Sequence, residues 1–129
     1  MKNSVLHPAA SRFYADHGWL QSAQTFSFHG NYDPQRIQFV ALRVLNDDTV
    51  NGGKGFGRHP HDNMEIISIP LEGTLEHQDS MGNTTVIRRG EIQVMSAGTG
   101  VYHTEFNKDP DEPVTFLQIW LYPKKLNVT

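Results

Sequence analysis

The chain has 129 residues, a size that suits one domain with a single hydrophobic core. Eleven Lys and Arg against fourteen Asp and Glu give a formal net charge of −3, and no basic run could follow a phosphate backbone, so direct nucleic-acid binding is not expected. The chain also lacks the apolar segments of a secretory signal or a membrane-spanning helix, which predicts a cytoplasmic protein with no membrane contact.

Cysteine is absent and histidine is abundant. The lack of cysteine excludes disulfides, thiolate nucleophiles and Cys-based zinc sites. Seven histidines are many for a chain of this length, and imidazole is both the commonest metal ligand and a frequent general base. The positions of the histidines are therefore the first place to look for chemistry.

Turn-forming residues recur at short intervals, and no window of helical length has a sustained amphipathic period, which predicts an all-β fold. The first expected element is a helical turn at Ala9–His17, closed by Gly18. Strands are expected after it at Thr25–Phe28, Phe39–Asn46, Met64–Leu71, Thr74–Asp79, Thr84–Arg88, Glu91–Ser96, Val101–Phe106 and Val114–Tyr122. Turns are expected at 51–53, 72–73, 81–83, 89–90 and 109–111. Short strands joined by tight turns are typical of a β-sandwich or a small barrel.

The last predicted strand is apolar on both faces. Val114, Phe116, Trp120 and Tyr122 would point one way, and Leu117, Ile119 and Leu121 the other. A strand with one face in water should instead alternate between apolar and polar residues. We therefore expect the second face to be covered by the N-terminal segment, by a second protomer or by a domain absent from this chain.

Two short patterns carry the chemistry, His59-Pro60-His61 and His103-Thr104-Glu105. Residues i and i+2 of an extended strand project from the same face, so each pattern can present two ligand atoms to one point. On neighbouring strands the two patterns would form a pocket with four ligands. Because Pro60 has no backbone N–H, its segment should lie at a strand start or a sheet edge.

The proposed ligands restrict the metal. Three imidazoles and one carboxylate suit Fe(II), Mn, Ni, Cu or Zn better than Ca or Mg. A six-coordinate ion would keep open positions, at which a substrate or oxygen could bind. The pattern therefore predicts one divalent transition metal.

The wider pattern resembles two motifs of the cupin superfamily. The first motif is matched by Gly53, His59, His61, Glu65 and Gly73, and the second by Gly100, His103 and Asn107. Gly73 comes one residue later than the general pattern, and Gly98 replaces the usual proline. These departures, with the segments 15–19, 25–28, 42–48, 59–66, 71–83 and 95–105, resemble the pirin family from about residue 12 to about residue 122.

The resemblance implies a fold and a set of ligands. The fold is a cupin-type double-stranded β-sandwich or small barrel, similar to a jelly roll. The pirin pattern places the metal ligands at His59, His61, His103 and Glu105, and iron is the usual metal of the family. The general cupin pattern would instead use Glu65 as the carboxylate ligand; we favour Glu105, with Glu65 close to the site.

The resemblance also implies a function. Some pirins are quercetin 2,3-dioxygenases, which implies that the metal centre opens a flavonol ring with O2 and that Glu105 also acts as the catalytic proton acceptor. The substrate would be a small aromatic molecule. Other pirins bind transcription factors or metabolic enzymes, so the alternative is a non-catalytic or redox-sensing regulatory protein. A third reading is a domain that keeps its metal without activity.

The remaining histidines and the aromatic residues have less specific roles. We expect His77 to be a hydrogen-bonded structural residue, with lining of the pocket as the alternative. His17 is expected to be structural, and His7 and His29 to face solvent. An apolar cavity could be walled by Phe39, Phe56, Met64, Met95, Phe106, Phe116 and Trp120, although scattered residues of this kind more often form plain core.

The length suggests part of a larger architecture. Typical pirins are about twice this long and carry a second, C-terminal cupin domain. Residues 1–129 are therefore expected to be a single cupin domain equivalent to the N-terminal half, without the C-terminal cupin. The apolar second face of the last strand then predicts a homodimer, formed by direct contact or by strand exchange.

Overall fold

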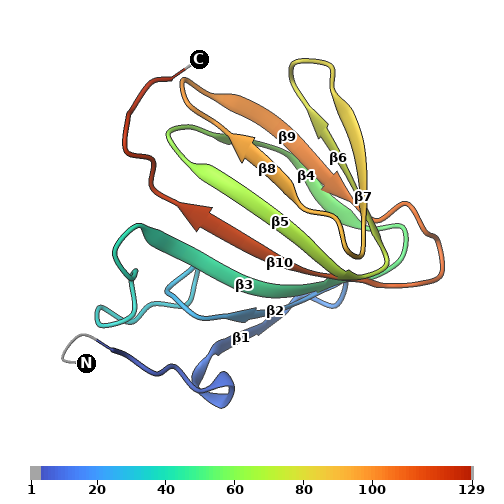
Figure 1. Ribbon diagram of the computed structural model, residues 1–129. Helices are drawn as coiled ribbons and strands as arrows, with labels where there is room; N and C mark the ends of the chain where they lie inside the picture. Colours follow the sequence, from blue (N-terminus) through green and yellow to red (C-terminus); the bar gives the residue numbers. More distant parts are fainter. Residues whose placement is uncertain (1–3, 129) are drawn as a thin grey trace.

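The computed structural model describes residues 4–128, which form two antiparallel β-sheets packed face to face (Figure 1). In spatial order, the larger sheet contains β1 (Phe13–Asp16), β2 (Leu20–Gln24), β3 (Leu42–Val50), β10 (Val114–Leu121), β5 (Glu65–Glu72) and β8 (Gln93–Ser96). The smaller sheet contains β4 (Gly55–His61), β9 (Val101–Phe106), β6 (Thr74–Asp79) and β7 (Thr84–Arg88). The predicted all-β cupin sandwich is confirmed, and the ends of the predicted domain, residues 1–3 and 129, lie outside the described residues.

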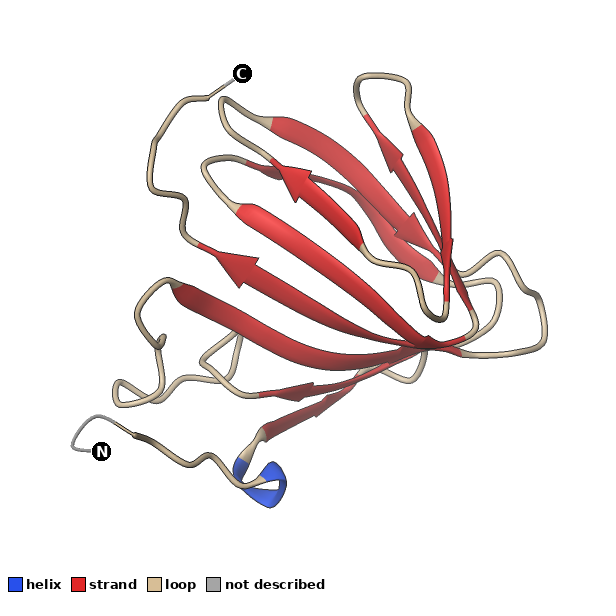
Figure 2. Ribbon diagram, in the orientation of Figure 1, coloured by secondary structure: helices blue, strands red, loops and turns tan. Residues whose placement is uncertain are grey.

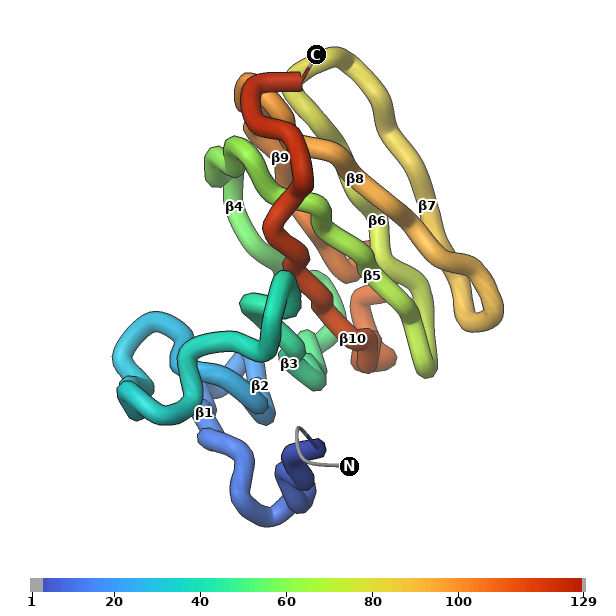
Figure 3. The backbone as a smooth tube through the Cα atoms, turned by 60° about the vertical axis from the view of Figure 1, so that its left-hand side comes forward, coloured from blue at the N-terminus to red at the C-terminus, as the bar shows by residue number. Residues whose placement is uncertain are grey.

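Strands account for nearly all the regular structure (Figure 2). The helical structure of the described part is a single 3₁₀ turn, Ala9–Ser11, and none of it is long and apolar enough to cross a membrane. The C-terminal tail lies against the turn between β8 and β9, where the Thr99 N–H donates to the Val128 carbonyl at 3.0 Å. The tail and the N-terminal segment leave the sandwich at opposite ends (Figure 3).

The strand predictions are accurate in the second half of the chain. Strands β6, β7 and β9 have the predicted bounds; β8 and β10 differ from the prediction by one or two residues at one end, and β5 is shifted by one residue. The predicted turns lie in connections between strands, except that Glu72 of the 72–73 turn is the last residue of β5. Tight turns at glycine fix these boundaries, as at Gly73, which has φ +79° and whose added Cβ would lie 2.8 Å from the Pro113 carbonyl oxygen.

The helical turn predicted at Ala9–His17 is present only as the 3₁₀ turn Ala9–Ser11, and the rest of the prediction is wrong. After the 3₁₀ turn the chain extends into β1, which pairs with β2 from Phe13 opposite Gln24 to Asp16 opposite Gln21. The burial of β1 alternates with the period of a strand, and pairing with β2 prevails over the weak helical pattern. Gly18 closes the β1–β2 hairpin turn instead of a helix, with its N–H donating to the Asp16 carboxylate at 2.8 Å.

The predicted strand at Thr25–Phe28 is also displaced. The strand is β2, which ends at Gln24, and Phe28 makes only an isolated bridge to Asn31. The Ser27 hydroxyl donates to the Asp33 carbonyl at 2.9 Å, which holds the segment in a loop. Similarly, the strand predicted at Phe39–Asn46 is β3, which begins at Leu42 and continues to Val50.

The side chains of the central strand β10 divide between two faces as predicted, but the inner face, predicted to be apolar, also carries the polar Gln118. Phe116 and Gln118 face the smaller sheet and are buried, whereas Leu117 and Ile119 lie on the opposite side and are partly exposed. Tyr122 lies beyond the strand. We call the side away from the smaller sheet the outer face; its partly exposed apolar residues are Leu45, Ile67, Ile69, Leu117 and Ile119.

The apolar core lies at one end of the space between the sheets. Its buried residues are Leu20, Val50, Leu75, Ile87, Val114 and Phe116. Next to it, the side chain of Asn107 is buried and donates to the carbonyls of Val50, at 3.1 Å, and Glu112, at 2.8 Å. Asn107 thereby ties the β9–β10 connection to the end of β3.

Candidate metal centre

The two patterns with potential ligands lie on adjacent strands. Strand β4 is an edge strand that pairs with β9, and His59 lies directly opposite His103. The edge position explains how Pro60 is tolerated within a strand, and it confirms the predicted location. Gly55 is needed at the start of β4, because an added Cβ would collide with the backbone of Glu105 and Phe106.

The three predicted histidine ligands converge. The pairing of β4 with β9 shifts register between Phe56 and His59, an irregularity of the kind that re-aims side chains in sheets. The ring centroid of His103 lies 4.2 Å from that of His59 and 4.7 Å from that of His61. One nitrogen from each ring lies within 4.8 Å of the others, an arrangement that could hold a metal ion.

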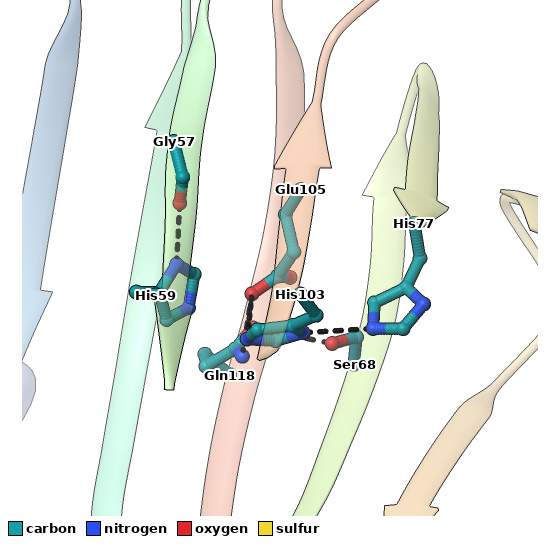
Figure 4. Close-up of polar contacts among 7 residues, drawn as sticks. All are labelled: Gly57, His59, Ser68, His77, His103, Glu105 and Gln118. Atoms are coloured by element: carbon teal, nitrogen blue, oxygen red, sulfur yellow. Dashed lines mark hydrogen bonds and ion pairs between the residues drawn. The ribbon is translucent and has the colours of Figure 1, made fainter. Parts of the chain in front are cut away.

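Hydrogen bonds orient two of these rings (Figure 4). Nδ1 of His59 lies 2.7 Å from the Gly57 carbonyl oxygen, and because a carbonyl only accepts, this nitrogen carries the proton and Nε2 has the free lone pair. Nδ1 of His103 lies 2.7 Å from Nε2 of His77. If His103 donates this hydrogen bond, its own Nε2 is likewise free to bind a metal.

Burial keeps the central imidazoles neutral. Desolvation, reinforced by neighbouring histidines, lowers the pKa of His61 to about 4 and that of His103 to about 3. Desolvation also lowers the pKa of His77. At neutral pH these rings are therefore in the form that binds metal ions.

Glu105 lies beside the histidines. Its Oε1 is 3.8 Å from Nε2 of His103 and accepts a hydrogen bond from the Gln118 amide at 3.2 Å. The Ser68 hydroxyl in turn donates to the Gln118 side-chain oxygen at 3.2 Å, so three strands of the two sheets fix the carboxylate (Figure 4). Burial, and then the negative charge of Asp48, raises the pKa of Glu105 to about 7, although the Gln118 hydrogen bond opposes this.

The alternative carboxylate, Glu65, has different partners. It lies on β5 of the larger sheet, on the side opposite the buried Ile66 and Ser68. The Ser96 hydroxyl lies 2.5 Å from both of its carboxylate oxygens. The structure therefore brings Glu105, and not Glu65, next to a histidine of the cluster.

The donor atoms fit a metal ion. Among the described residues, His61 Nε2, His103 Nε2 and Glu105 Oε2 are buried without any hydrogen-bond partner. Such atoms are rare in proteins because each one left unpaired costs about 1–3 kcal/mol. Imidazole nitrogens with a carboxylate are also ligands that divalent transition metals accept.

A cavity of about 1120 Å³ opens beside this cluster, between the two sheets. His59, His61 and Glu105 border it, together with the two aromatic pairs Trp19–Phe56 and Phe28–Trp120, whose ring centroids lie 5.3 and 5.5 Å apart. Of the predicted wall residues, Phe56 and Trp120 therefore line the cavity.

The other predicted wall residues lie elsewhere. Phe116 is fully buried in the apolar core, and Phe39 is 48% exposed. Met64 borders a separate, shallower groove, while Met95 and Phe106 are half-buried outside the cavity lining. Inward-facing positions next to the ligands, and not aromatic character alone, determine which residues form the wall.

The other histidines divide as follows. His77 is buried and hydrogen-bonded, as predicted, but its partner is a candidate ligand. His17 and His29 are exposed and lie at the cavity rim. His7 is only half-exposed, because its ring packs on Phe26 with the centroids 5.9 Å apart, so the predicted solvent-facing position is wrong for it.

Several residues near the site were not predicted, among them Gln118, Ser68 and Asp48. All three are polar residues that occupy inward-facing positions on strands of the larger sheet. The available signal was the polar residue within the apolar run of β10, between Phe116 and Trp120. Its significance depends on which residues of the other sheet lie opposite, which the local pattern does not contain.

A β-sandwich that gathers imidazoles and a carboxylate from two adjacent strands defines a metal-binding protein of the cupin class. The Pirin family model matches residues 7–121, and the chain belongs to the pirin family. It is 52% identical over 124 residues to a quercetin 2,3-dioxygenase of Escherichia coli K12, covering 96% of this chain and 54% of that protein.

Solved structures of an Escherichia coli protein, YhhW, have the same fold. One has a TM-score of 0.93 and 52% identity, and covers 95% of this chain and 52% of the YhhW chain. Another, described as bacterial pirin YhhW in complex with nickel(II), has a TM-score of 0.91 and 51% identity, with 94% and 52% covered. This chain thus spans about half the length of the relatives it matches.

Proposed function

We propose that this domain binds one divalent transition metal through His59, His61, His103 and Glu105 and opens a flavonol ring with O2, as a quercetin 2,3-dioxygenase. The observation that carries the proposal is the convergence of buried nitrogen and oxygen atoms that have no partner in the protein. The similarity to a quercetin 2,3-dioxygenase and to a pirin complexed with nickel(II) supports it.

Iron(II) is the metal we propose, because the reaction needs a centre that can exchange electrons with O2. The same ligands accept nickel, copper, manganese or zinc, and availability in the cell decides among such ions. When bound, the metal would supply Lewis acidity to the substrate's oxygen and redox capacity for the reaction with O2. Both oxygen atoms enter the product of a dioxygenase, so no further reductant is required.

Glu105 is the group we propose for proton transfer. Gln118 holds Oε1, whereas Oε2 has no hydrogen-bond partner and remains available. The carboxylate would take the proton of the flavonol 3-hydroxyl, so that the substrate binds as an anion. This requires Glu105 either to serve as ligand and base together or to leave the metal when the substrate arrives.

The cavity walls are suited to the rest of the substrate. The rings of Trp19, Phe28, Phe56 and Trp120 offer apolar faces, on which a planar aromatic molecule can pack. A ligand in this space would also exclude water from the oxygen atoms of Glu105. These side chains therefore orient the substrate while Glu105 handles its proton.

The metal site is tested by elemental analysis of protein purified without a metal-affinity tag. The wild type should contain about one metal ion per chain, and His103→Ala and Glu105→Ala should contain much less. His7→Ala is the matched control, because His7 packs on Phe26 and lies outside the cluster. Full metal content in both site variants would contradict the proposed ligands.

The reaction is tested by reconstituting the protein with Fe(II) under anaerobic conditions and then adding O2 with quercetin. Oxygen uptake with loss of the flavonol absorbance is expected for the wild type and absent in His103→Ala. A metal-loaded protein that consumes no oxygen would contradict the dioxygenase proposal. Metal-dependent binding to a transcription factor or a metabolic enzyme would then favour the regulatory alternative.

A further inference from the structure

The inner surface of the larger sheet carries a row of buried polar residues, of which only Gln118 has a role at the metal centre. Strand pairing places Ser22 opposite Asp48, and Asn46 opposite both Gln24 and Gln118. Each of these side chains is at most 6% exposed. Inward-facing positions of a sandwich are normally apolar, because buried polar groups are unfavourable unless they are bonded.

Asp48 is the least satisfied member of this row. It is 5% exposed, and its Oδ1 has no hydrogen-bond partner. Burial raises its pKa to about 6, although the Ser22 hydroxyl opposes this. The adjacent Asp47 faces the other way and forms an ion pair with Arg12 at 3.6 Å, so this cation lies on the opposite side of β3 from Asp48.

The position of Asp48 relates it to the metal centre. Asp48 and Glu105 border the same cavity. Asp48 is diagonal to Gln118, the residue that holds Glu105, and diagonal neighbours on adjacent strands are separated by roughly 7–8 Å. Because both carboxylates border one cavity, a ligand with one oxygen at Glu105 can bring another part of the same ring system to Asp48.

The remaining cavity wall indicates the class of ligand. The Trp120 indole N–H is buried without a partner and also borders the cavity, so a hydrogen-bond donor and an acceptor both remain free there. The aromatic rings around them favour a flat, apolar framework. A planar aromatic molecule with several hydroxyl groups satisfies all of these features.

We propose that Asp48 selects polyhydroxylated aromatic ligands, by accepting a hydrogen bond from a ring hydroxyl distant from the one that meets Glu105. This subsite rests on the proposed function, since it places the substrate's reacting hydroxyl at the metal centre. A flavonol that has only the 3-hydroxyl would leave Asp48 without a partner, as it is in the free protein, and would gain no affinity from this subsite.

The test measures binding without turnover. Protein loaded with nickel(II) is titrated without oxygen with two probes, quercetin and 3-hydroxyflavone, which lacks the other ring hydroxyls. Asp48→Asn and Asp48→Ala should raise the Kd for quercetin by about 10–100-fold, as expected for loss of a hydrogen bond to a charged group. The Kd for 3-hydroxyflavone should not rise, and Asp47→Asn should alter neither value.

Two further measurements separate recognition from folding. Nickel content should be unchanged in both Asp48 variants, and the Tm of the ligand-free Asp48→Asn protein at pH 8 should be higher than that of the wild type, because a buried unpaired charge is removed. A lower Tm accompanied by equal weakening of both flavonols would assign Asp48 a structural role and overturn the proposal.

The remaining outcomes are also decisive. Unchanged quercetin binding in both Asp48 variants, or no binding of either flavonol to the wild type, overturns the subsite. By contrast, a protein that passes the binding test but consumes no oxygen contradicts only the dioxygenase reaction.

Discussion

The two ends of the space between the sheets differ, although the same strands build both. Strand β10 contributes Val114 and Phe116 to the apolar end, and then Gln118 to the polar end. Strand β6 likewise provides Leu75 to the core and His77 to the metal centre. Among the described residues, the polar end retains buried side-chain atoms without hydrogen-bond partners, including His103 Nε2 and Glu105 Oε2. Stability and chemistry thus have separate locations along each strand.

The largest expected effect is at the apolar end. Phe116→Ala should lower the free energy of unfolding by about 3–5 kcal/mol, because it removes a fully buried ring from the core. The protein that remains folded should still bind one metal ion. Urea denaturation and elemental analysis measure the two quantities, and Phe39→Ala, at an exposed ring, is the control. Loss of metal in the folded fraction would show that the two ends are not independent.

The next largest effect is on the stability of the metal-free protein, through the ionisation of Glu105 at the polar end. The folded pKa of Glu105, about 7, lies above its ordinary value of 4.5, so between these values the folded protein holds a proton that the unfolded chain has released. Stability from this group is therefore lost as pH rises through this window. Metal-free Glu105→Gln should exceed the wild type in unfolding free energy by about 2–3 kcal/mol at pH 8.

The advantage of Glu105→Gln should vanish near pH 4, where the carboxyl group is protonated in both states. Ionisation of the buried histidines changes stability in the opposite direction, but it is common to both proteins and cancels in the difference. Urea denaturation across this pH range measures it. An equal difference at every pH would mean that the substitution acts through packing and not through charge.

A smaller effect is expected at His77, which contacts the proposed ligand His103 but not the cavity. His77→Phe removes the partner of His103 Nδ1, and loss of such a partner typically lowers metal affinity by about 10–100-fold. Competition with a chelator measures this affinity for nickel(II). His77→Gln, which retains a hydrogen-bonding group, should recover part of it; equal losses in both variants would contradict the orienting role.

The smallest effect is expected outside the sandwich interior. The outer face of the larger sheet is apolar and partly exposed, and the chain studied by itself is expected to form a dimer through it. Ile119→Lys should raise the dimer dissociation constant by about tenfold without changing metal content. Sedimentation at micromolar concentrations tests this, and a wild type that is monomeric throughout would contradict the expectation.

The sequence was most informative where local rules determine the structure. Turns at glycine defined β6, β7 and β9, and the i, i+2 spacing of His59 and His61 correctly placed both on one side of an edge strand. Strand β1 was missed and β2 was predicted too late in the chain, because both are short and their pairing with each other outweighs weak local preferences. Strand β4 was not predicted as a strand.

The polar surroundings of the metal centre could not be predicted in the same way. Gln118 matters because it meets Glu105, and Asp48 because it borders the same cavity. In both cases the residue lies on the larger sheet, whereas Glu105 lies on the smaller one. Each residue is an ordinary polar position within its own strand, and only the packing of the two sheets gives it a role.

Asn107 also determines how far the chain tolerates insertions. Glu105 and Gln118 meet across a connection that Asn107 anchors by its hydrogen bonds, at the apolar end of the sandwich. Because successive side chains of a strand alternate between faces, one added residue that shifted β10 would turn Gln118 outward and bring an apolar neighbour to Glu105. A tag or loop graft between residues 107 and 113 would therefore alter the contact between Gln118 and Glu105 at the metal centre, although it would be attached at the other end of the sandwich.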